Sequence, residues 1–571
     1  MNGKQKLELT WIGKGQRSRL EPRILLEDPS LSHHAQTRHE GDIFDNRLIF
    51  GDNLLALKAL EQEFTGKVKC IYIDPPYNTG SAFEHYNDGI EHSIWLSLMR
   101  ERLEILWNLL DVNDGSIWMS IDEDEHAYLR VLCDEIFGRN QFVATNVWQK
   151  RYAPDARVAI SDAHEYILCY AKDLQNFKLK RNLLLLTDAQ TKQFRNPDRD
   201  FRGPWKADNF TAPGFRQNQM YEITLPSGRV VTPPGGRCWR FTKEGFERAV
   251  SENKMYYGPD GDGAPSIKRF LSEMPGMVPW TWWSHSEVGH SQEGKKENQV
   301  LFGSDNAFST PKPERLIQRI LHIATNPGDL VLDSFAGSGT TGAVAHKMGR
   351  RWIMVELGEH CHTHIVPRLK KVIDGEDKGG ITEVIDWKGG GGYRYLRLAP
   401  SLLAKDRFDN WVIAPDYNAA MLAEAVCKLM GFTYAPSQLA EEYWRHGHST
   451  ESDFIYVTTQ SLTHDALKKL SEEVGPQRTL LVCCKAWSGK EGALSNLTVN
   501  KIPQTVLKKC EWGRDDYSLT VASLPDAPMI NEAEPDGDTA ELNHVAARHR
   551  GRAHKELELS LFDDDVGLGE D

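Results

Sequence analysis

Cysteine is sparse in this sequence, and long apolar runs are missing from it. The nine cysteines are scattered over 571 residues and none forms a Cys-x-x-Cys pair, which excludes a disulfide framework and is typical of reduced thiols. The longest leucine run, 183–186, is far shorter than the ~20 apolar residues of a membrane-spanning helix. The first residues also carry no signal-peptide hydrophobic region. We therefore expect a soluble, cytoplasmic protein with no membrane partner.

Acidic residues outnumber basic ones, and the excess is concentrated at one end. The net charge is −13, from 68 Lys and Arg against 81 Asp and Glu, which at first disfavours a nucleic-acid binder. Residues 524–571 hold 13 acidic and four basic side chains, whereas residues 148–250 hold 18 basic and 11 acidic ones. This segregation permits a basic face on an acidic protein. Solvated surface charge without a partner explains the pattern equally well when it is taken alone.

Strands and helices alternate over much of the chain. At roughly 150 residues per domain the length predicts two to four domains. After an N-terminal arm (1–44), hydrophobic periodicity predicts strands at 47–50, 67–73, 115–121, 165–170, 330–333 and 351–356, and helices at 53–63, 92–110, 123–137, 313–325 and from the glycine loop to 348. This order predicts an α/β fold with a mostly parallel, doubly wound sheet.

The alternation stops between residues 172 and 306, where turn pairs and aromatic residues are dense. We expect this segment to be a domain inserted between two halves of one domain, 45–171 and 307–388. A glycine-rich linker (389–399) is then predicted to lead to a smaller C-terminal α/β domain (400–525) with strands at 454–458 and 479–484 and helices at 463–473 and 504–510. An acidic, mobile tail (526–571) is expected to follow.

A glycine-rich loop, 333–342, lies between a predicted strand and a predicted helix. Glycines let a backbone approach a ligand closely, and the first N–H groups of a helix favour anionic groups. Glu356 ends the next strand, where a carboxylate can accept hydrogen bonds from ribose hydroxyls. The spacing of Gly337, Gly339 and Gly342 also fits a dinucleotide-binding loop, so a nicotinamide-dependent oxidoreductase remains an alternative, as does a tight turn without a ligand.

The second motif is Asp74-Pro75-Pro76-Tyr77, at the end of the strand 67–73. The exocyclic amine of a nucleobase is a poor nucleophile because its lone pair is delocalised into the ring. A carboxylate from Asp74 and the backbone carbonyl of Pro75 can accept its two N–H bonds and free that lone pair, while the prolines fix the direction of the carbonyl. Tyr77 can stack on the base only after the base has left the helix. A strand end closed by a proline turn is the alternative without chemistry.

These two motifs resemble those of the amino methyltransferases of DNA. The catalytic motif precedes the cofactor motif, as in the circularly permuted β class, and residues 51–54, 71–80, 95–96, 120–122 and 312–317 resemble the modification (Mod) subunit of type III restriction–modification systems. The resemblance implies a Rossmann-like methyltransferase sheet with an inserted target-recognition domain. It also implies S-adenosylmethionine as methyl donor and adenine N6 of double-stranded DNA as acceptor.

The resemblance assigns site residues by position. Asp74, Pro75, Pro76 and Tyr77 are the expected catalytic residues. The expected cofactor-binding residues are Asp333, Phe335, Ala336, Gly337, Gly339, Thr340, Glu356, Lys312, Pro313, Asp52 and Asn53. No metal is expected, because four potential ligands at 360, 361, 362 and 364 on one helix cannot all point the same way.

Several alternatives remain open at this point. Aspartate at position 74 favours adenine, yet a cytosine-N4 methyltransferase uses the same arrangement of motifs. The chain could also serve mainly as a DNA-recognition and docking subunit for a helicase–nuclease, with residues 400–525 and the tail as the docking region. By resemblance alone we expect a homodimer.

Overall fold

The computed structural model describes residues 8–77, 92–154, 156–490 and 492–518, and the account below concerns these residues. The expected acidic tail (526–571) and residues 78–80, which belong to the segment 71–80 of the resemblance, lie outside the described residues. Within the described part, no helix combines the length and apolar character that a membrane crossing demands.

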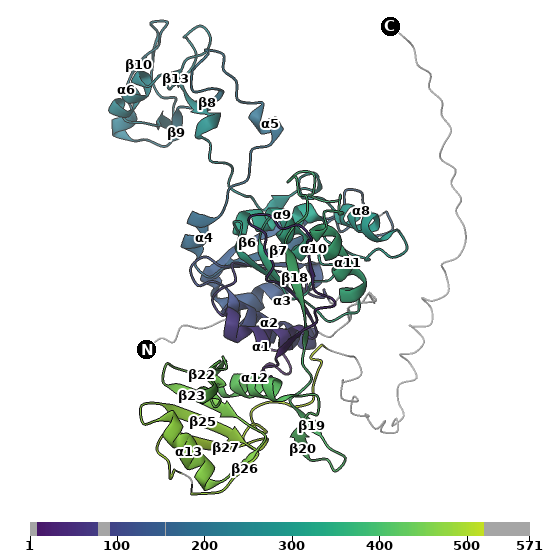
Figure 1. The fold of residues 1–571 in the computed structure, drawn as a ribbon. Helices are drawn as coiled ribbons and strands as arrows, with labels where there is room; N and C mark the ends of the chain where they lie inside the picture. The colour runs from purple at the N-terminus through teal and green to yellow at the C-terminus, as the bar shows by residue number, and fades with distance from the viewer. Residues whose placement is uncertain (1–7, 78–91, 155, 491, 519–571) are drawn as a thin grey trace, which may run out of the picture. The chain divides into compact units, whose positions relative to one another are not determined.

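One large mixed sheet forms the centre of the protein (Figure 1). Within the described residues it has eleven strands, and β2 (His33–His34) pairs only with β18. The other strands lie in the order β1 (Leu25–Glu27), β18 (Gly392–Leu398), β3 (Asn46–Phe50), β17 (Arg351–Glu356), β16 (Leu330–Asp333), β4 (Cys70–Ile73), β5 (Ser116–Ile121), β7 (His164–Ala171), β6 (Phe142–Gln149), β15 (Trp282–Trp283). All pairings from β18 to β5 are parallel, and β7 is antiparallel to both of its neighbours.

The strand order shows a circular permutation. β16 and β17 come late in the chain, yet they lie between β3 and β4, which come early. β16 pairs in parallel with β4, with Val331 opposite Cys70 and Leu332 opposite Ile71. The predicted doubly wound, permuted sheet is therefore confirmed, and it places the strands before the two sequence motifs side by side.

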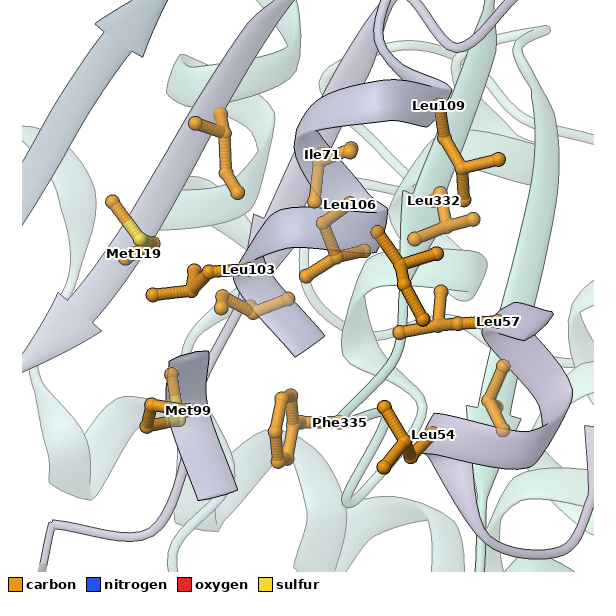
Figure 2. Close-up of a cluster of buried hydrophobic side chains, with 14 of the residues drawn as sticks. Leu54, Leu57, Ile71, Met99, Leu103, Leu106, Leu109, Met119, Leu332 and Phe335 are labelled. Atoms are coloured by element: carbon orange, nitrogen blue, oxygen red, sulfur yellow. The ribbon is translucent and has the colours of Figure 1, made fainter. Parts of the chain in front are cut away.

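Alternation along the strands builds a core on each face of the sheet. Along β16, Leu332 belongs to one core and Val331 to the other; along β4, Ile71 and Cys70 divide in the same way. The first core is covered by α1 (Asn53–Phe64), α2 (His92–Leu109) and α3 (Glu123–Cys133), and Figure 2 shows Leu103 and Leu106 of α2 packed towards Ile71 and Leu332. The second core is covered by α9 (Glu314–Ala324), α10 (Thr340–Lys347) and α11 (Val366–Ile373).

Two predicted boundaries in this sheet are wrong. The expected glycine-rich linker 389–399 contains β18, whose residues Tyr393 and Tyr395 are buried while Arg394 is exposed. Leu396, on the opposite face of the strand, is buried as well, so both faces are covered; the neighbouring glycines hid this pattern. Part of the expected N-terminal arm also joins the sheet, because β1 and β2 both pair with β18. Pairing with a distant strand gives these short segments a structure that their own sequence does not specify.

The inserted segment has a small core of its own. One sheet is formed by β8 (Trp205–Asn209), β14 (Ser266–Phe270) and β13 (Met255–Tyr256). Two further antiparallel pairs join β9 (Thr211–Pro213) to β12 (Arg237–Trp239) and β10 (Ile223–Thr224) to β11 (Val230–Val231). The helix α6 (Lys243–Ser251) packs on these strands. Leu184 and Met277 exchange backbone hydrogen bonds of 2.8 Å in both directions and close the segment at its base. Beyond that bridge the chain returns to the central sheet through β15 and continues in α8 (Ser291–Phe302).

The C-terminal part contains a second, smaller α/β unit. Its sheet has the order β21 (Thr433–Tyr434), β22 (Gly447–His448), β23 (Asp453–Val457), β25 (Thr479–Cys484) and β27 (Leu497–Lys501), with α12 (Ala419–Met430) and α13 (His464–Val474) packed on it. The expected helix 504–510 is wrong. Val506 and Cys510 do join the core, but residues 502–509 form successive turns, since so short a segment gains too few helical hydrogen bonds to fix a helix against its packing.

We predict that Leu106→Ala lowers the stability of the protein by about 2–5 kcal/mol, because Leu106 is fully buried against the sheet and its loss leaves a cavity. Leu179→Ala is the matched control, since Leu179 is 80% exposed on α4 (Leu174–Lys180). Urea unfolding monitored by tryptophan fluorescence measures both. Equal midpoints for the two variants would contradict this account of the core.

Candidate active site

The two motifs meet at one edge of the sheet. Because β4 and β16 are parallel neighbours, their carboxyl ends lie together, and Asp74 follows one strand while Asp333 ends the other. Both aspartates line a single pocket with a cavity volume of about 40 Å³. Its other walls come from Tyr72, Phe308, Thr310, Lys312, Ile317, Phe335, Ala336, Gly337, Ser338, Thr340 and Thr341. The donor and acceptor loops expected from the sequence are thus adjacent in space.

Asp74 is held by a buried lysine and by its own motif. The ammonium of Lys312 donates to both carboxylate oxygens, at 2.9 and 2.8 Å, and the Tyr77 hydroxyl donates to Oδ1 at 2.6 Å. Lys312 is only 12% exposed, and it precedes the first residue of α9 by two positions. The sequence resemblance places Lys312 at the border of the cofactor pocket; the structure puts its ammonium on the carboxylate of the other motif.

The two prolines are fixed by a helix that packs beneath them. Trp95 on α2 is fully buried, and its indole N–H donates to the Pro76 carbonyl at 2.7 Å. Proline lacks an N–H and has a restricted φ, so this single bond is enough to hold the turn after β4. Pro75 is buried between Asp74 and this anchored residue.

Tyr77 takes part in the polar cluster with its hydroxyl. This hydroxyl also lies 3.2 Å from Glu165 Oε2, and it accepts a bond of 3.0 Å from Lys312. Burial, then the nearby carboxylates of Asp74 and Glu165, raise the pKa of Tyr77 well above its usual value, so the side chain is a neutral phenol. Stacking of its ring on a base stays a prediction.

The glycine loop is held by the aspartate that ends β16. Asp333 accepts from the backbone N–H of Phe335 at 2.9 Å and from the Thr341 hydroxyl at 2.6 Å. Burial raises its pKa to about 7, and these two hydrogen bonds only partly oppose that shift. A cationic ligand beside this carboxylate would be favoured, because it would offset the cost of the buried charge.

Two glycines of the loop are required by its geometry. Gly339 has φ +75°, and a Cβ there would lie 3.0 Å from Ile365. A Cβ on Gly342 would lie 2.3 Å from the methyl of Met354 on β17, so this glycine permits close packing of α10 on the sheet. Its packing role explains the Gly-x-Gly-x-x-Gly spacing without a dinucleotide.

Glu356 lies at the end of β17, beside the loop. Its carboxylate accepts from Gly337 N–H at 2.7 Å and from the N–H groups of Leu357 and Gly358 at 2.9 Å each. A carboxylate has about four acceptor positions, so capacity remains for a hydroxyl donor. The place expected for a ribose-binding residue is therefore filled by a suitable group, and its binding role stays a prediction.

Asp52 and Asn53 lie outside the described pocket, and Asn53 contacts the glycine loop. Asp52 caps α1 by accepting from Leu55 N–H, and it also accepts from Tyr517 N–H at 3.0 Å. Asn53 donates to the Ser334 carbonyl at 2.8 Å. Neither residue is among those that line the described pocket, and their role in cofactor binding stays a prediction. Pro313, which the sequence predicts as the first residue of a helix, is the N-cap residue of α9, so the helix begins one residue later than predicted.

Some residues of the site have no signal in the sequence. Glu165, near the start of β7, contacts Tyr77 and Lys312. In the sequence it is distinguished only as a charged residue at the beginning of an apolar run. Arg368 on α11 donates to the Thr340 hydroxyl at 2.8 Å and to Glu314 at 2.9 Å, which links the glycine loop to the start of α9. Such links join elements far apart in the chain, so local periodicity cannot reveal them.

The histidines near residue 360 point to separate partners. His362 Nε2 lies 2.7 Å from the Tyr395 hydroxyl, and His364 Nε2 lies 2.9 Å from the Asn306 carbonyl. Among the described residues, no group of three or more His, Cys, Asp or Glu side chains is arranged to hold a metal ion.

Comparison with known proteins agrees with this geometry. The family model described as DNA methylase (N6_N4_Mtase) matches residues 68–367, which are 300 of the 571 residues. The chain belongs to the DNA methylase family. The match includes both motifs and the whole segment inserted between them.

Named relatives of this DNA methylase include Mod subunits. It is 32% identical over 368 residues to the type III restriction-modification enzyme StyLTI Mod subunit of Salmonella typhimurium (58% of this chain, 55% of that protein). It is 25% identical over 570 residues to the EcoP15I Mod subunit of Escherichia coli (82% and 85%) and 31% identical over 324 residues to the type II methyltransferase M.EcaI of Enterobacter cloacae (55% and 67%). The chain spans about half the length of the first of these relatives.

Solved structures give weaker matches. A DNA modification methylase from Thermus thermophilus, solved with S-adenosyl-L-methionine, is 18% identical, with a TM-score of 0.29 over 58% of this chain and 97% of that one. The fold assignment therefore depends on the strand order and on the family match.

We predict that Asp333→Asn changes how stability depends on pH in the cofactor-free protein. The folded pKa of about 7 lies above the usual 3.8, so the folded state holds a proton that the unfolded state loses between about pH 4 and 7. The stability from this proton is complete below pH 4 and is lost as the pH rises to 7. The variant does not lose stability in this way. The thermal midpoint of the variant minus that of the wild type should therefore rise by roughly 2–6 °C from pH 5 to pH 8.

Glu383→Gln, at an exposed position, is the control and should follow the wild-type curve. Parallel pH curves for Asp333→Asn and the wild type would show that Asp333 is ionised throughout the range.

Proposed function

We propose that this protein is a site-specific DNA methyltransferase that transfers a methyl group from S-adenosylmethionine to adenine N6 of a flipped base. The main support for the proposal is the single pocket lined by Asp74 of one loop and by Asp333 and Phe335 of the other. This pocket brings a carboxylate suited to an exocyclic amine within reach of a loop suited to a cationic, nucleoside-containing ligand.

The residues of this chain fit S-adenosylmethionine. The cofactor supplies a methyl group on a sulfonium, which is already a good leaving group. Asp333 offers a buried carboxylate whose ionised form a neighbouring cation would favour, Gly337 and Gly339 allow close backbone approach, and Glu356 is placed for a hydroxyl-bearing group.

Asp74 and the proline turn act on the acceptor. The carboxylate accepts one N–H of the exocyclic amine and the Pro75 carbonyl accepts the other, which draws the nitrogen towards tetrahedral geometry and frees its lone pair for in-line attack. Trp95 holds the turn through Pro76, so the carbonyl is oriented before the base arrives. Tyr77 stacks on the base after its hydroxyl leaves Asp74. Adenine is preferred over cytosine N4 because the motif begins with aspartate; cytosine N4 is the alternative.

The inserted segment is proposed to read the DNA sequence. It has its own core, and a groove of about 520 Å³ in it has basic side chains from Arg240, Arg248, Lys254 and Arg269 along its wall, against Glu252 and Glu273. Contacts of these side chains with phosphates make binding fall with rising salt.

We also propose that the chain is the modification and recognition subunit of a restriction or phage-defence system. The relatives named Mod subunits of type III restriction–modification enzymes support this assignment. A homodimer and a helicase–nuclease partner are proposed on the same ground, with the C-terminal α/β unit, which has its own cores, as the docking region. Sequencing of modified bases in DNA from cells that express the chain tests the proposal, because it reports the site, base and atom together; unmodified DNA would refute it.

Asp74→Ala is predicted to lower the methylation rate at least 10³-fold, because the acceptor of the amine's N–H is lost. Its affinity for S-adenosylmethionine should change less than threefold, since the glycine loop is untouched. Single-turnover transfer of a labelled methyl group and calorimetric cofactor titration measure the two quantities. Retention of more than a tenth of the wild-type rate would remove Asp74 from the catalytic role.

Exchange of residues 184–277 for the corresponding segment of a relative is predicted to change the DNA sequence that is modified. The mutual hydrogen bonds of Leu184 and Met277 mark the ends of the segment, so cuts there leave β15 and the central sheet intact. Modified-base sequencing of DNA from cells that express the chimera gives the new site. An active chimera with the original site would place recognition elsewhere in the chain.

A further inference from the structure

The ammonium of Lys312 occupies the position that the amine of the target base needs. It donates to both oxygens of Asp74 and to the Tyr77 hydroxyl, at 2.8–3.0 Å. An ammonium and an exocyclic amine both present N–H donors, and the amine requires one of the two carboxylate oxygens, both of which Lys312 contacts. Because the Tyr77 hydroxyl also lies on Oδ1, entry of the amine costs Lys312 at least one of its contacts with Asp74.

A displaced ammonium needs another partner, because a buried unpaired charge is strongly disfavoured. The rings of Tyr77 and Trp148 flank the ammonium, with centroids 5.1 and 5.9 Å away. Glu165 Oε2 is the next carboxylate oxygen, 3.6 Å from Nζ, and its side chain is only 10% exposed. A small rotation of the lysine side chain is enough to bring the two together.

Glu165 is itself held in place for this task. It lies opposite Trp148 in the β6–β7 pair, and its other oxygen, Oε1, is 3.4 Å from Lys150, which also pairs with Asp162 at 2.8 Å. The Tyr77 hydroxyl lies 2.6 Å from Asp74 and 3.2 Å from Glu165, so it can change its hydrogen-bond acceptor from the first carboxylate to the second. Both donors that leave Asp74 thus have Glu165 within reach.

We propose that Glu165 is a positioning residue of the methyl-transfer site, which receives the Lys312 ammonium when the amine of the target base replaces it at Asp74. The proposal rests on the proposed function. Before DNA binds, Lys312 keeps Asp74 paired and the acceptor pocket closed. In the complex, transfer of the ammonium to Glu165 leaves Asp74 with its full accepting strength and moves a positive charge away from the nitrogen that becomes cationic as it is methylated.

The charge state of Lys312 agrees with this role. Burial alone would lower the pKa of its ammonium, but Asp74 and Glu165 outweigh that effect and raise the pKa above its usual value. The lysine is therefore a cation at neutral pH and cannot avoid the conflict by losing its proton.

The test compares Glu165→Gln with the wild type on duplex DNA that carries 2-aminopurine beside the target adenine, because extrusion of the adenine unstacks the probe and raises its fluorescence. The wild type must first methylate the unlabelled site; if it does not, the proposed function fails and not this inference. In Glu165→Gln we expect the extrusion signal and the single-turnover rate to fall at least tenfold, while affinity for S-adenosylhomocysteine changes less than threefold. Glu165→Asp, which keeps the charge, should recover at least a third of the wild-type signal.

A double-mutant cycle separates positioning from a general structural effect. In a Lys312→Met background no ammonium has to be received, so adding Glu165→Gln should change the extrusion signal less than twofold. This readout needs no methyl transfer, so a low rate in the Lys312 variant does not prevent the measurement. Glu123→Gln is the control, because Glu123 accepts from the hydroxyl of Tyr166 next to Glu165 but lies outside the cluster.

Two results would overturn the proposal. One is an extrusion signal and a rate in Glu165→Gln that equal those of the wild type. The other is an equal loss of extrusion signal when Glu165→Gln is introduced into the wild type and into the Lys312→Met variant. If Glu165→Gln does not fold, as judged by its thermal midpoint, Glu165→Ala, which also removes the charge, replaces it in the cycle. A signal in Glu165→Ala equal to that of the wild type would then count against the proposal.

Discussion

The parallel pairing of β4 with β16 is the constraint on which the site depends. Two strands that are about 260 residues apart in the chain are hydrogen-bonded neighbours, and their carboxyl ends open at the same edge of the sheet. Because the backbone sets this arrangement, the acid of one motif and the glycine loop of the other face one pocket without any hinge. The helices on each face bury the alternate residues of these strands, so the same core that stabilises the fold also fixes the distance between the loops.

Charge at the site is balanced by pairs that span several elements. Asp74 after β4, Lys312 before α9 and Glu165 on β7 form one group, and Glu314, Lys347 and Arg368 form a second group behind the glycine loop. Each buried charge has a partner from a different part of the chain, and removal of one partner leaves the other uncompensated. The first group has an additional property, since one cation is shared between two carboxylates and can favour either of them.

The insertion between the two halves is placed where it does not disturb the pairing. It leaves after β7 and α4 and returns at β15, beside β6, so the strands that carry the motifs remain in the interior of the sheet. A segment with its own core can vary in sequence without moving Asp74 or Asp333.

Local patterns in the chain were enough to predict β3, β4, β5, β7, β16 and β17 of the central sheet, the helices α1, α2, α3, α9 and α10 that cover it, and the order of the two motifs, whereas β6 was not predicted. Strong hydrophobic periodicity marked 330–333 and 351–356 as strands, and Asp74-Pro75-Pro76-Tyr77 and the glycine loop are short patterns that chemistry makes specific. Folding was needed to show that glycines 389–392 lead into a strand, that 504–510 forms turns, that Lys312 lies on Asp74 and that Glu165 and Arg368 belong to the site. The difference comes from the range of the interactions, because periodicity and turn preferences act between near neighbours, whereas strand pairing and buried ion pairs join residues that only the folded chain brings together.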